Sequence, residues 1–348
     1  MEQTHEVPFI RLEGSPHERG LAHGRAAAER IAKNVDFYKK LLKLDDEVLR
    51  ARSHHFADRI KSFRPAFVEE MDGIAEGAGV EAVYIYMINA RTELLSLSDE
   101  VHSECATFYF SPTSLLFENW DWSESSKDLT VLLSIALPEG RTVLTFTEAG
   151  MLGKVGMSSA GFGVAFNYLY PNGVLDGVPI HAVLRAILES ASFEEASVLL
   201  STTDLKGTSG NILLADARGH ANDYELSGTS TSVVPLSGDS LVHTNHYLGG
   251  VANDPEAGEG FLHNSFERYA RAQHIIAHSQ EYDRDVAQQL LLDRGEGEGM
   301  LCRDFIPEEL GSTPTGTIAS LIMDLPAKTI YIALNPQSAD SEFTHYSL

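Results

Sequence analysis

The sequence has little cysteine, little positive charge and no long apolar run. Its 348 residues include two cysteines, Cys105 and Cys302. Two cysteines so far apart do not form a disulfide framework, and they favour a reducing, intracellular and cytoplasmic setting. No apolar run approaches the roughly 18 residues of a membrane span. The first residues, MEQTHEVPFIRLEG, include acidic side chains and lack the apolar core of a signal peptide. We therefore expect neither a membrane span nor a signal peptide.

The scarcity of cations narrows the classes of partner. There are 26 Lys and Arg residues against 50 Asp and Glu residues, a net charge of −24. This balance argues against nucleic acid, which is bound by neutralising phosphates, and against anionic membrane surfaces. It also argues weakly against a polyphosphate ligand such as coenzyme A. The acidic segment Gly295–Gly299 (GEGEG) is a poor phosphate cradle because no Lys follows it. We expect no cofactor, and the sequence leaves homo-oligomerisation open.

What the chain does contain is a change from helix to sheet near residue 105. Apolar spacing predicts helices over most of the first 100 residues, and short β-branched or aromatic runs predict strands after them. The expected helices are 16–43, 45–62, 65–77, 81–97, 179–189, 193–201, 263–278 and 284–292. The expected strands are 7–12, 106–110, 115–119, 129–136, 142–147, 153–157, 163–167, 211–216, 220–226, 230–235, 241–244, 316–324 and 328–334.

Two local features sharpen this prediction. Ser15, Pro16 and Glu18 stand in capping-box register, which predicts the start of the first helix. Gly20 and Gly24 lie four apart, and so on one helix face, which is typical of close helix packing. Strands do not alternate singly with helices, so we expect a layered α+β fold of antiparallel sheets covered by helices. We see no linker or repeat, and expect a loosely ordered tail from residue 336.

Cys105 begins a predicted β-hairpin. The run CATFYF is followed by the polar turn Ser111–Ser114 and by the returning run LLFENWDW, which carries Asn119 and Asp121. A cysteine here is either a small buried apolar residue or a nucleophile. A nucleophilic thiolate needs a base. If the chain is cut before Cys105, its own α-amine, with an ordinary pKa of about 8, can serve. A papain-like site fits less well, because Cys105 begins a strand and the Cys-Gly-x-Cys-Trp signature is missing.

Several short motifs, in order along nearly the whole chain, resemble one family. They are 12–24 (LEGSPHERGLAHG), 73–79 (GIAEGAG), 89–93 (NARTE), 105–107 (CAT), 119–122 (NWDW), 156–163 (GMSSAGFG), 167–169 (NYL), 243–246 (HTNH), 265–268 (SFER) and 301–303 (LCR). Together they resemble the acyl-coenzyme A:6-aminopenicillanic acid acyltransferase (isopenicillin-N acyltransferase-like) family. Its members are N-terminal nucleophile hydrolases.

The resemblance implies a four-layer αββα sandwich, formed by a single domain over 1–348, that cuts itself between Glu104 and Cys105. The fragments 1–104, a helical lead segment, and 105–348, the sheet-bearing body, would stay associated. By the same resemblance Cys105 is the nucleophile and its new amine is the base. The best-known members have Gly before the cysteine, so Glu104 either slows processing or assists it through its carboxylate.

Further roles follow only from the resemblance. Thr107 would assist processing or orient the amine, and Asp121 would hold the amine. Asn245 would donate to the oxyanion, and Arg303 would be an electrostatic partner of the nucleophile. Asp121 could instead cap a turn, Thr107 could face a neighbouring strand, and Arg303 could form a surface ion pair.

Four polar positions remain more open. Asn167 and Asn119 are candidates for the oxyanion hole or for substrate contact, with a structural amide as the alternative. His243 and His246 lie close in sequence, but no Asp or Cys is near them and no HExxH pattern is present, so we expect no metal.

The expected activity is cleavage or transfer of the acyl group of a small N-acyl amide or peptide-like substrate through a Cys105 thioester. Water as acceptor makes the protein an amidohydrolase, and an amine makes it an acyltransferase. The acidic balance favours hydrolysis. The alternatives are an unprocessed binding protein that retains the fold, and a coenzyme A-dependent N-acyltransferase.

Overall fold

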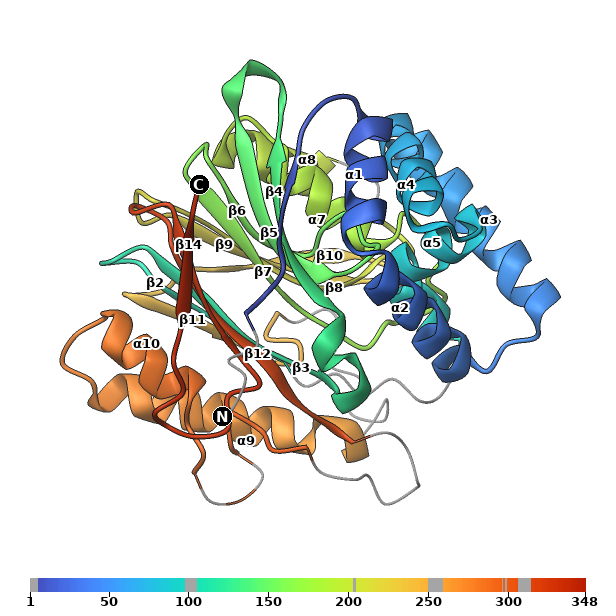
Figure 1. Cartoon of the computed structure of the whole chain (residues 1–348). Helices are drawn as coiled ribbons and strands as arrows, with labels where there is room; N and C mark the ends of the chain where they lie inside the picture. Colours follow the sequence, from blue (N-terminus) through green and yellow to red (C-terminus); the bar gives the residue numbers. More distant parts are fainter. Residues whose placement is uncertain are drawn as a thin grey trace, which may run out of the picture.

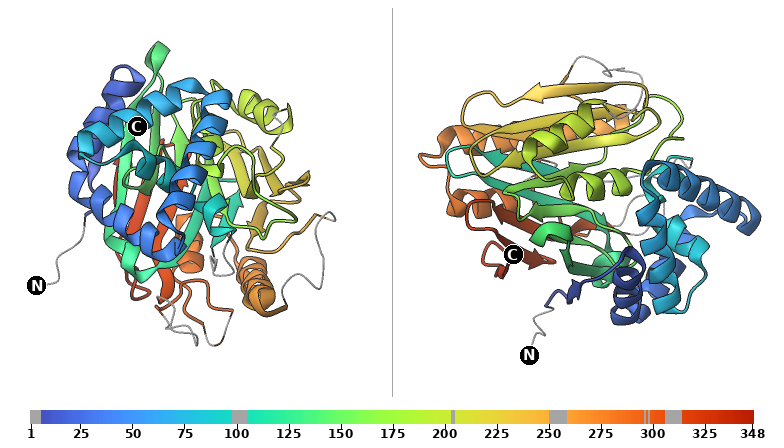
Figure 2. Two further views of the ribbon diagram at one scale, coloured as in Figure 1. Left: turned by 90° about the vertical axis from the view of Figure 1, so that its right-hand side faces the viewer. Right: turned by 90° about the horizontal axis from the view of Figure 1, so that it is seen from above.

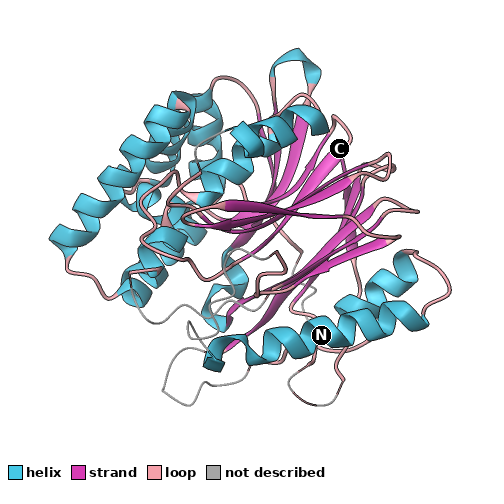
Figure 3. Ribbon diagram, turned by 180° about the vertical axis from the view of Figure 1, so that it is seen from behind, coloured by secondary structure: helices cyan, strands magenta, loops and turns pink. Residues whose placement is uncertain are grey.

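Two β-sheets lie face to face between helical layers in the computed structural model (Figures 1 and 3). The structure describes residues 6–97, 105–202, 205–249, 259–295, 297, 299–305 and 314–348. Glu104, on one side of the predicted cleavage point, lies outside the described residues.

The first sheet has eight strands and is antiparallel except at one edge. In spatial order they are β1 (Phe9–Leu12), β4 (Thr130–Ala136), β5 (Thr142–Glu148), β6 (Val155–Ser158), β7 (Phe162–Asn167), β8 (Ser209–Asp216), β9 (Ala221–Ser227) and β10 (Thr231–Pro235). The edge strand β1 runs parallel to β4, with Phe9 beside Leu132. A strand from the start of the chain thus completes a sheet made of later residues.

The second sheet has six strands and contains the hairpin that begins after Cys105. In spatial order they are β11 (Ser240–His243), β2 (Ala106–Phe110), β3 (Leu115–Ser123), β12 (Thr315–Asp324), β13 (Thr329–Leu334) and β14 (Thr344–Ser347). The hairpin pairs Ala106 with Asn119 and Phe110 with Leu115, as the sequence predicts. β2 and β3 face β7 of the first sheet, and large apolar side chains from both sheets fill the space between them.

Helices cover the outer faces of both sheets. α7 (Ile180–Leu188) and α8 (Phe193–Thr202) pack on the first sheet, and α9 (Glu259–His278) and α10 (Arg284–Leu291) pack on the second. Short 3₁₀ turns, η1 (Glu124–Leu129) and η2 (Pro138–Gly140), flank β4. The layer order is the expected αββα arrangement. Within the described ranges, no helix is both long and apolar enough to cross a membrane.

The lead segment forms a helical group beside the sheets (Figure 2). Its helices are α1 (Pro16–Ala26), α2 (Ala28–Leu42), α3 (Asp46–Phe63), α4 (Pro65–Ala78), α5 (Ala82–Asn89) and α6 (Arg91–Leu95). α2 and α5 are fixed to the first sheet by amide hydrogen bonds, from Asn34 to the Ala149 carbonyl and from Asn89 to the Gly150 carbonyl, each 2.9 Å long.

Most predicted elements are confirmed, including the capping box of Ser15 and Glu18. Two predicted helices are divided, 16–43 at Ala27 and 81–97 at Ala90. Neither break coincides with Gly or Pro, so the local sequence does not predict that a helix ends there. The first break follows from packing, because α1 lies along α4 whereas α2 also contacts η1 and α6. The tail from residue 336 was wrongly expected to be loose, since β14 pairs with β13.

The contact between α1 and α4 depends on glycine. A Cβ built on Gly20 would lie 2.0 Å from the Glu70 carbonyl oxygen, and one on Gly24 would lie 2.3 Å from the Ile74 carbonyl oxygen. The opposing Gly73 and Gly77 of α4 meet the backbone of α1 in the same way. The predicted close packing of the Gly20–Gly24 face is therefore confirmed, and the two backbones touch.

We predict that Gly24→Ala lowers the free energy of unfolding by about 1–3 kcal/mol, because the added methyl forces the two helices apart. Helix propensity alone would give the opposite sign, a gain of up to about 1 kcal/mol. Urea denaturation measures the difference. The control is Arg25→Ala at the adjacent exposed position, which should change stability by less than about 0.5 kcal/mol. A Gly24→Ala protein as stable as the wild type would contradict the prediction.

Candidate active site

Cys105 lies at the entrance to β2, buried beside the far end of β3. The hairpin register places Ala106 opposite Asn119, and β3 continues to Ser123. Residues 120–122 therefore run past the point where β2 begins. The Cys105 side chain is 1% exposed, and its Sγ lies 3.9 Å from the main-chain oxygen of Asp121. The predicted nucleophile thus lies beside the backbone of Asp121, the residue predicted to hold the amine.

The Asp121 carboxyl is held from one side only. Opposite it, β12 has an irregularity between Thr317 and Ala319, a feature often found near functional sites because it redirects a side chain. The Thr317 hydroxyl donates to Asp121 Oδ1 over 2.6 Å. The other oxygen, Oδ2, is buried and has no hydrogen-bond partner among the described residues. Burial raises the pKa of Asp121 to about 7, opposed by the Thr317 hydrogen bond and the charge of Arg268.

Asn245 is brought to the same place by the loop after β11. Its main-chain N–H donates to Ser265 Oγ and its Nδ2 donates to the Tyr168 carbonyl, over 2.8 and 2.9 Å. Its Oδ1 accepts from Arg268 Nη2 over 2.8 Å, while Arg268 Nη1 donates to the Cys105 carbonyl over 2.8 Å. The structure thus connects the predicted oxyanion donor to the predicted nucleophile through one guanidinium group.

Thr107 belongs to a buried polar network between the sheets. Its hydroxyl accepts from Asn167 Nδ2 over 2.8 Å and donates to Asn211 Oδ1 over 3.4 Å. Asn167 Nδ2 also reaches Asn211 Oδ1 and the His243 carbonyl, at 3.1 and 3.2 Å. The donors of Asn167 are thus occupied by protein groups. The arrangement joins β7 and β8 of the first sheet to β2 of the second.

Arg303 and Asn119 form hydrogen bonds with groups other than those that hold Asn245. The main-chain N–H of Arg303 donates to Thr317 Oγ1 over 2.8 Å, so Arg303 supports the residue that holds Asp121. Asn119 donates to the carbonyls of Leu291 and Leu301 and accepts from Ser320. Those bonds fasten β3 to the end of α10, which favours the structural alternative for Asn119.

A small cavity lies along the tryptophan-flanked part of β3. It measures about 20 Å³, room for about one water. Its walls are Arg91, Thr92, Leu95, Trp120, Trp122, Lys154, Phe166 and Tyr168. Pockets that hold small organic ligands measure about 300–1,000 Å³, so this cavity is too small to hold a substrate.

Two buried cations of this cavity also interact with Cys105. Lys154 Nζ lies 3.2 Å from the centroid of the Trp120 ring. Burial lowers the pKa of Lys154 to about 7, and the charges of Cys105 and Glu118 oppose that change. Arg91 Nε lies 2.9 Å from Glu148 Oε2, and the charge of Cys105 raises the pKa of Arg91 as well. A Cys105 thiolate therefore has favourable electrostatic partners on the cavity side.

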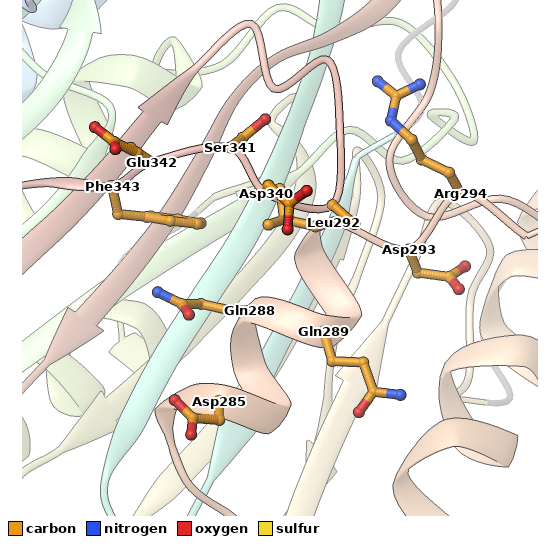
Figure 4. Close-up of a pocket in the computed structure, with 11 residues that line it drawn as sticks. Asp285, Gln288, Gln289, Leu292, Asp293, Arg294, Asp340, Ser341, Glu342 and Phe343 are labelled. Carbon is orange, nitrogen blue, oxygen red and sulfur yellow. The ribbon is translucent and has the colours of Figure 1, made fainter.

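A second hollow, much larger, lies elsewhere. It measures about 850 Å³ and lies between α10 and the segment before β14 (Figure 4). Asp285, Asp293 and Glu342 are among its lining side chains. It shares no residue with the predicted site. Within the described part of the chain, no group of three or more His, Cys, Asp or Glu side chains is arranged to hold a metal.

Sequence reasoning did not identify several residues of the site. The sequence indicates Arg268 only as the last residue of the SFER motif, and it predicts no role for Thr317 or Lys154. Their positions in strand-like or helical patterns carry no sign of these contacts. A signal was present for Lys154, because a lysine between buried strand residues needs a charged or aromatic partner.

Comparison with known proteins agrees with the sequence motifs. Residues 111–339 match the family described as acyl-coenzyme A:6-aminopenicillanic acid acyl-transferase. The chain is 30% identical over 346 residues to the acyl-coenzyme A:6-aminopenicillanic-acid-acyltransferase 40 kDa form of Emericella nidulans, covering 96% of this chain and 94% of that protein. It is 26% identical over 227 residues to protein dcd1A of Dictyostelium discoideum, covering 55% of this chain and 52% of that protein.

Among solved structures, a mutant conjugated bile acid hydrolase from Clostridium perfringens is similar with a TM-score of 0.46 and 13% identity, covering 71% of this chain and 97% of that one. The family match and the relative from Emericella nidulans extend over two thirds and nearly all of the chain, respectively. The chain therefore belongs to the acyl-coenzyme A:6-aminopenicillanic acid acyltransferase family.

Proposed function

We propose that this protein cuts itself between Glu104 and Cys105, and then cleaves or transfers the acyl group of a small N-acyl amide through a Cys105 thioester. The observation that carries the proposal is the buried Asp121 Oδ2, which has no hydrogen-bond partner among the described residues and lies on the strand beside Cys105. A cut releases an α-amine at Cys105. That amine supplies a donor to an oxygen that otherwise lacks one.

Self-cleavage consumes one water. The peptide bond between Glu104 and Cys105 breaks, Glu104 gains a carboxylate, and Cys105 gains an α-amine. This amine has an ordinary pKa of about 8, so it can both accept and return a proton near neutral pH. Asp121 would fix its position by accepting a hydrogen bond.

The fragments have strong reasons to remain together. β1 of the lead segment completes the sheet formed by the body, and buried ion pairs cross the cut. Arg91 Nε lies 2.9 Å from Glu148 Oε2, and Glu70 Oε1 lies 2.9 Å from Arg185 Nη1. Separation would leave these charges buried without partners, which costs several kcal/mol. The fragment 1–104 is therefore the proposed permanent partner of 105–348.

Turnover then follows from the positions of the groups. The Cys105 thiol loses its proton to the α-amine and its sulfur attacks the acyl carbonyl carbon. The carbonyl becomes an oxyanion, to which Asn245 Nδ2 donates. The amine product leaves with the proton returned by the α-amine, and a thioester remains. Water next attacks the thioester, which releases the carboxylic acid and restores the thiol.

Hydrolysis is favoured over coenzyme A-dependent transfer, although the relative from Emericella nidulans is named for coenzyme A. The net charge of −24 opposes a polyphosphate ligand. The cavity of about 20 Å³ beside the tryptophans is too small to hold an acyl group, so it does not bear on the choice of acyl part. The substrate class proposed here is a small N-acyl amide.

We predict that the purified protein yields a fragment beginning Cys105-Ala106-Thr107, and that Cys105→Ala remains one chain of about 38.1 kDa and is inactive, because both cleavage and turnover need the thiol. Intact-mass measurement and N-terminal sequencing test the first part, and release of 4-nitroaniline from N-acyl 4-nitroanilides tests the second. The control is Cys302→Ala, which should be cut and active. An active Cys105→Ala protein overturns the mechanism, and an uncut, inactive wild type supports the binding-protein alternative.

A second prediction concerns coenzyme A. Release of 4-nitroaniline from a panel of acetyl, octanoyl and phenylacetyl anilides should proceed at the same rate with and without free coenzyme A, since water is the proposed acceptor. Mass spectrometry should find the free carboxylic acid. If release requires coenzyme A and the product is an acyl thioester of it, the transfer alternative holds.

A third prediction follows from the raised pKa of Asp121. Between its ordinary pKa of 3.8 and the folded value of about 7, the unfolded chain has lost a proton that the folded chain retains. This group therefore makes stability fall as pH rises through that range. In the uncut Cys105→Ala background, Asp121→Asn should make the slope of unfolding free energy less negative by up to about 1.4 kcal/mol per pH unit. Urea titrations at several pH values measure the slope. Equal slopes for Cys105→Ala with and without Asp121→Asn would contradict this prediction.

A further inference from the structure

Two side chains on one turn of α9 form hydrogen bonds with Asn245, one with its main chain and one with its side chain. Ser265 Oγ accepts the main-chain N–H of Asn245 over 2.8 Å, and Arg268 Nη2 donates to Asn245 Oδ1 over 2.8 Å. Ser265 and Arg268 are three residues apart, a spacing that places both on one face of a helix. The SFER motif therefore has a physical meaning in this fold, namely a clamp on Asn245.

This clamp fixes the orientation of the side-chain amide of Asn245. A guanidinium group has five donors and no acceptor, so only the carbonyl oxygen of the amide can face Arg268. The amino group must then face the opposite side, where Nδ2 donates to the Tyr168 carbonyl over 2.9 Å. An amide nitrogen has two hydrogens, and Tyr168 occupies one. The second remains for an oxyanion.

Arg268 is itself fixed with respect to the nucleophile. It is fully buried, and its Nη1 donates to the Cys105 carbonyl over 2.8 Å. The two bonds leave from different nitrogens of one rigid planar group. The guanidinium therefore sets the distance and direction between the Asn245 amide and the Cys105 backbone. Burial lowers the pKa of Arg268, and the charges of Asp121 and Cys105 oppose that change.

We propose that Arg268 is a positioning residue, which acts through Asn245 by holding its side-chain amide with Nδ2 directed toward the reacting carbonyl. This inference rests on the proposed function, because it assigns Arg268 a task in the thioester chemistry of Cys105. It differs from a stabilising role in that its effect on turnover must pass through Asn245.

A double-mutant cycle separates the two roles. Full-length wild type, Asn245→Ala, Arg268→Met and the double variant are compared with an N-acyl 4-nitroanilide, with rates expressed per molecule of the 105–348 fragment. Loss of one oxyanion donor costs about 10²–10³ in kcat, so Asn245→Ala should lose that much. Arg268→Met should lose about 10- to 100-fold in kcat with KM nearly unchanged, the mark of an interaction made in the transition state.

The decisive value is that of the double variant. If Arg268 acts through Asn245, the double variant should be no slower than Asn245→Ala, because the amide that Arg268 positions is already absent. If the two losses multiply, or if Arg268→Met turns over at the wild-type rate, the proposal is wrong. A failure of the function itself looks different, since either Cys105→Ala would remain active or the wild type would be uncut and inactive.

Two further variants keep the test clear. Arg271→Met lies one turn along α9 and removes a partly exposed ion pair with Asp293, so it controls for the loss of an arginine from this helix and should keep wild-type turnover. If Arg268→Met fails to mature or fold, the cycle is run with Arg268→Lys. An ammonium group retains the charge but lacks the rigid fork, so this variant should also lose kcat, and full activity in it would overturn the proposal.

Discussion

The burial of the Asp121 carboxyl is the constraint on which the site depends. An isolated buried carboxylate is costly, and a buried oxygen without a hydrogen bond costs about 1–3 kcal/mol. β12 supplies a single hydroxyl, from Thr317, and Arg268 supplies a charge. On the same strand, Glu118 Oε1 and Trp122 Nε1 are also buried without a hydrogen-bond partner among the described residues, so β3 carries several incomplete polar groups near Cys105. Such an incomplete site is what a group produced by chain cleavage could fill.

The fold makes such a cleavage tolerable. The lead segment is attached by an edge strand, by amide bonds from Asn34 and Asn89, and by ion pairs to Glu148 and Arg185. None of these contacts involves the peptide bond before Cys105. A cut there would change the charge and hydrogen bonding of one strand end and leave the packing between the two parts intact. The proposed cleavage would in this way be separated from the contacts that hold the two parts together.

Sequence reasoning succeeded where the determinants are local or belong to a resemblance. The capping box of Ser15, the hairpin after Cys105 and most helices follow from short-range patterns, and the αββα layers came from the family motifs. The role of Asp121 stays a prediction. It failed where partners are distant along the chain. Arg268 meets Cys105 across 163 positions and Thr317 meets Asp121 across 196, and no periodicity reports such meetings. The break at Ala27 was missed for the same reason, since tertiary packing sets it.

The charges around Cys105 bear on what the site can bind. Arg91 is paired with Glu148, Lys154 interacts with Glu118, and Arg268 interacts with Asp121. Each of these three cations thus has a carboxyl group beside it or acting on its charge, and none of the three provides excess positive charge for an anionic ligand. Burial raises the pKa of Glu118 to about 7, as it lowers that of Lys154, so this pair can become neutral by exchanging one proton. A site balanced in this way would suit the neutral amide substrate proposed above better than a permanently anionic ligand.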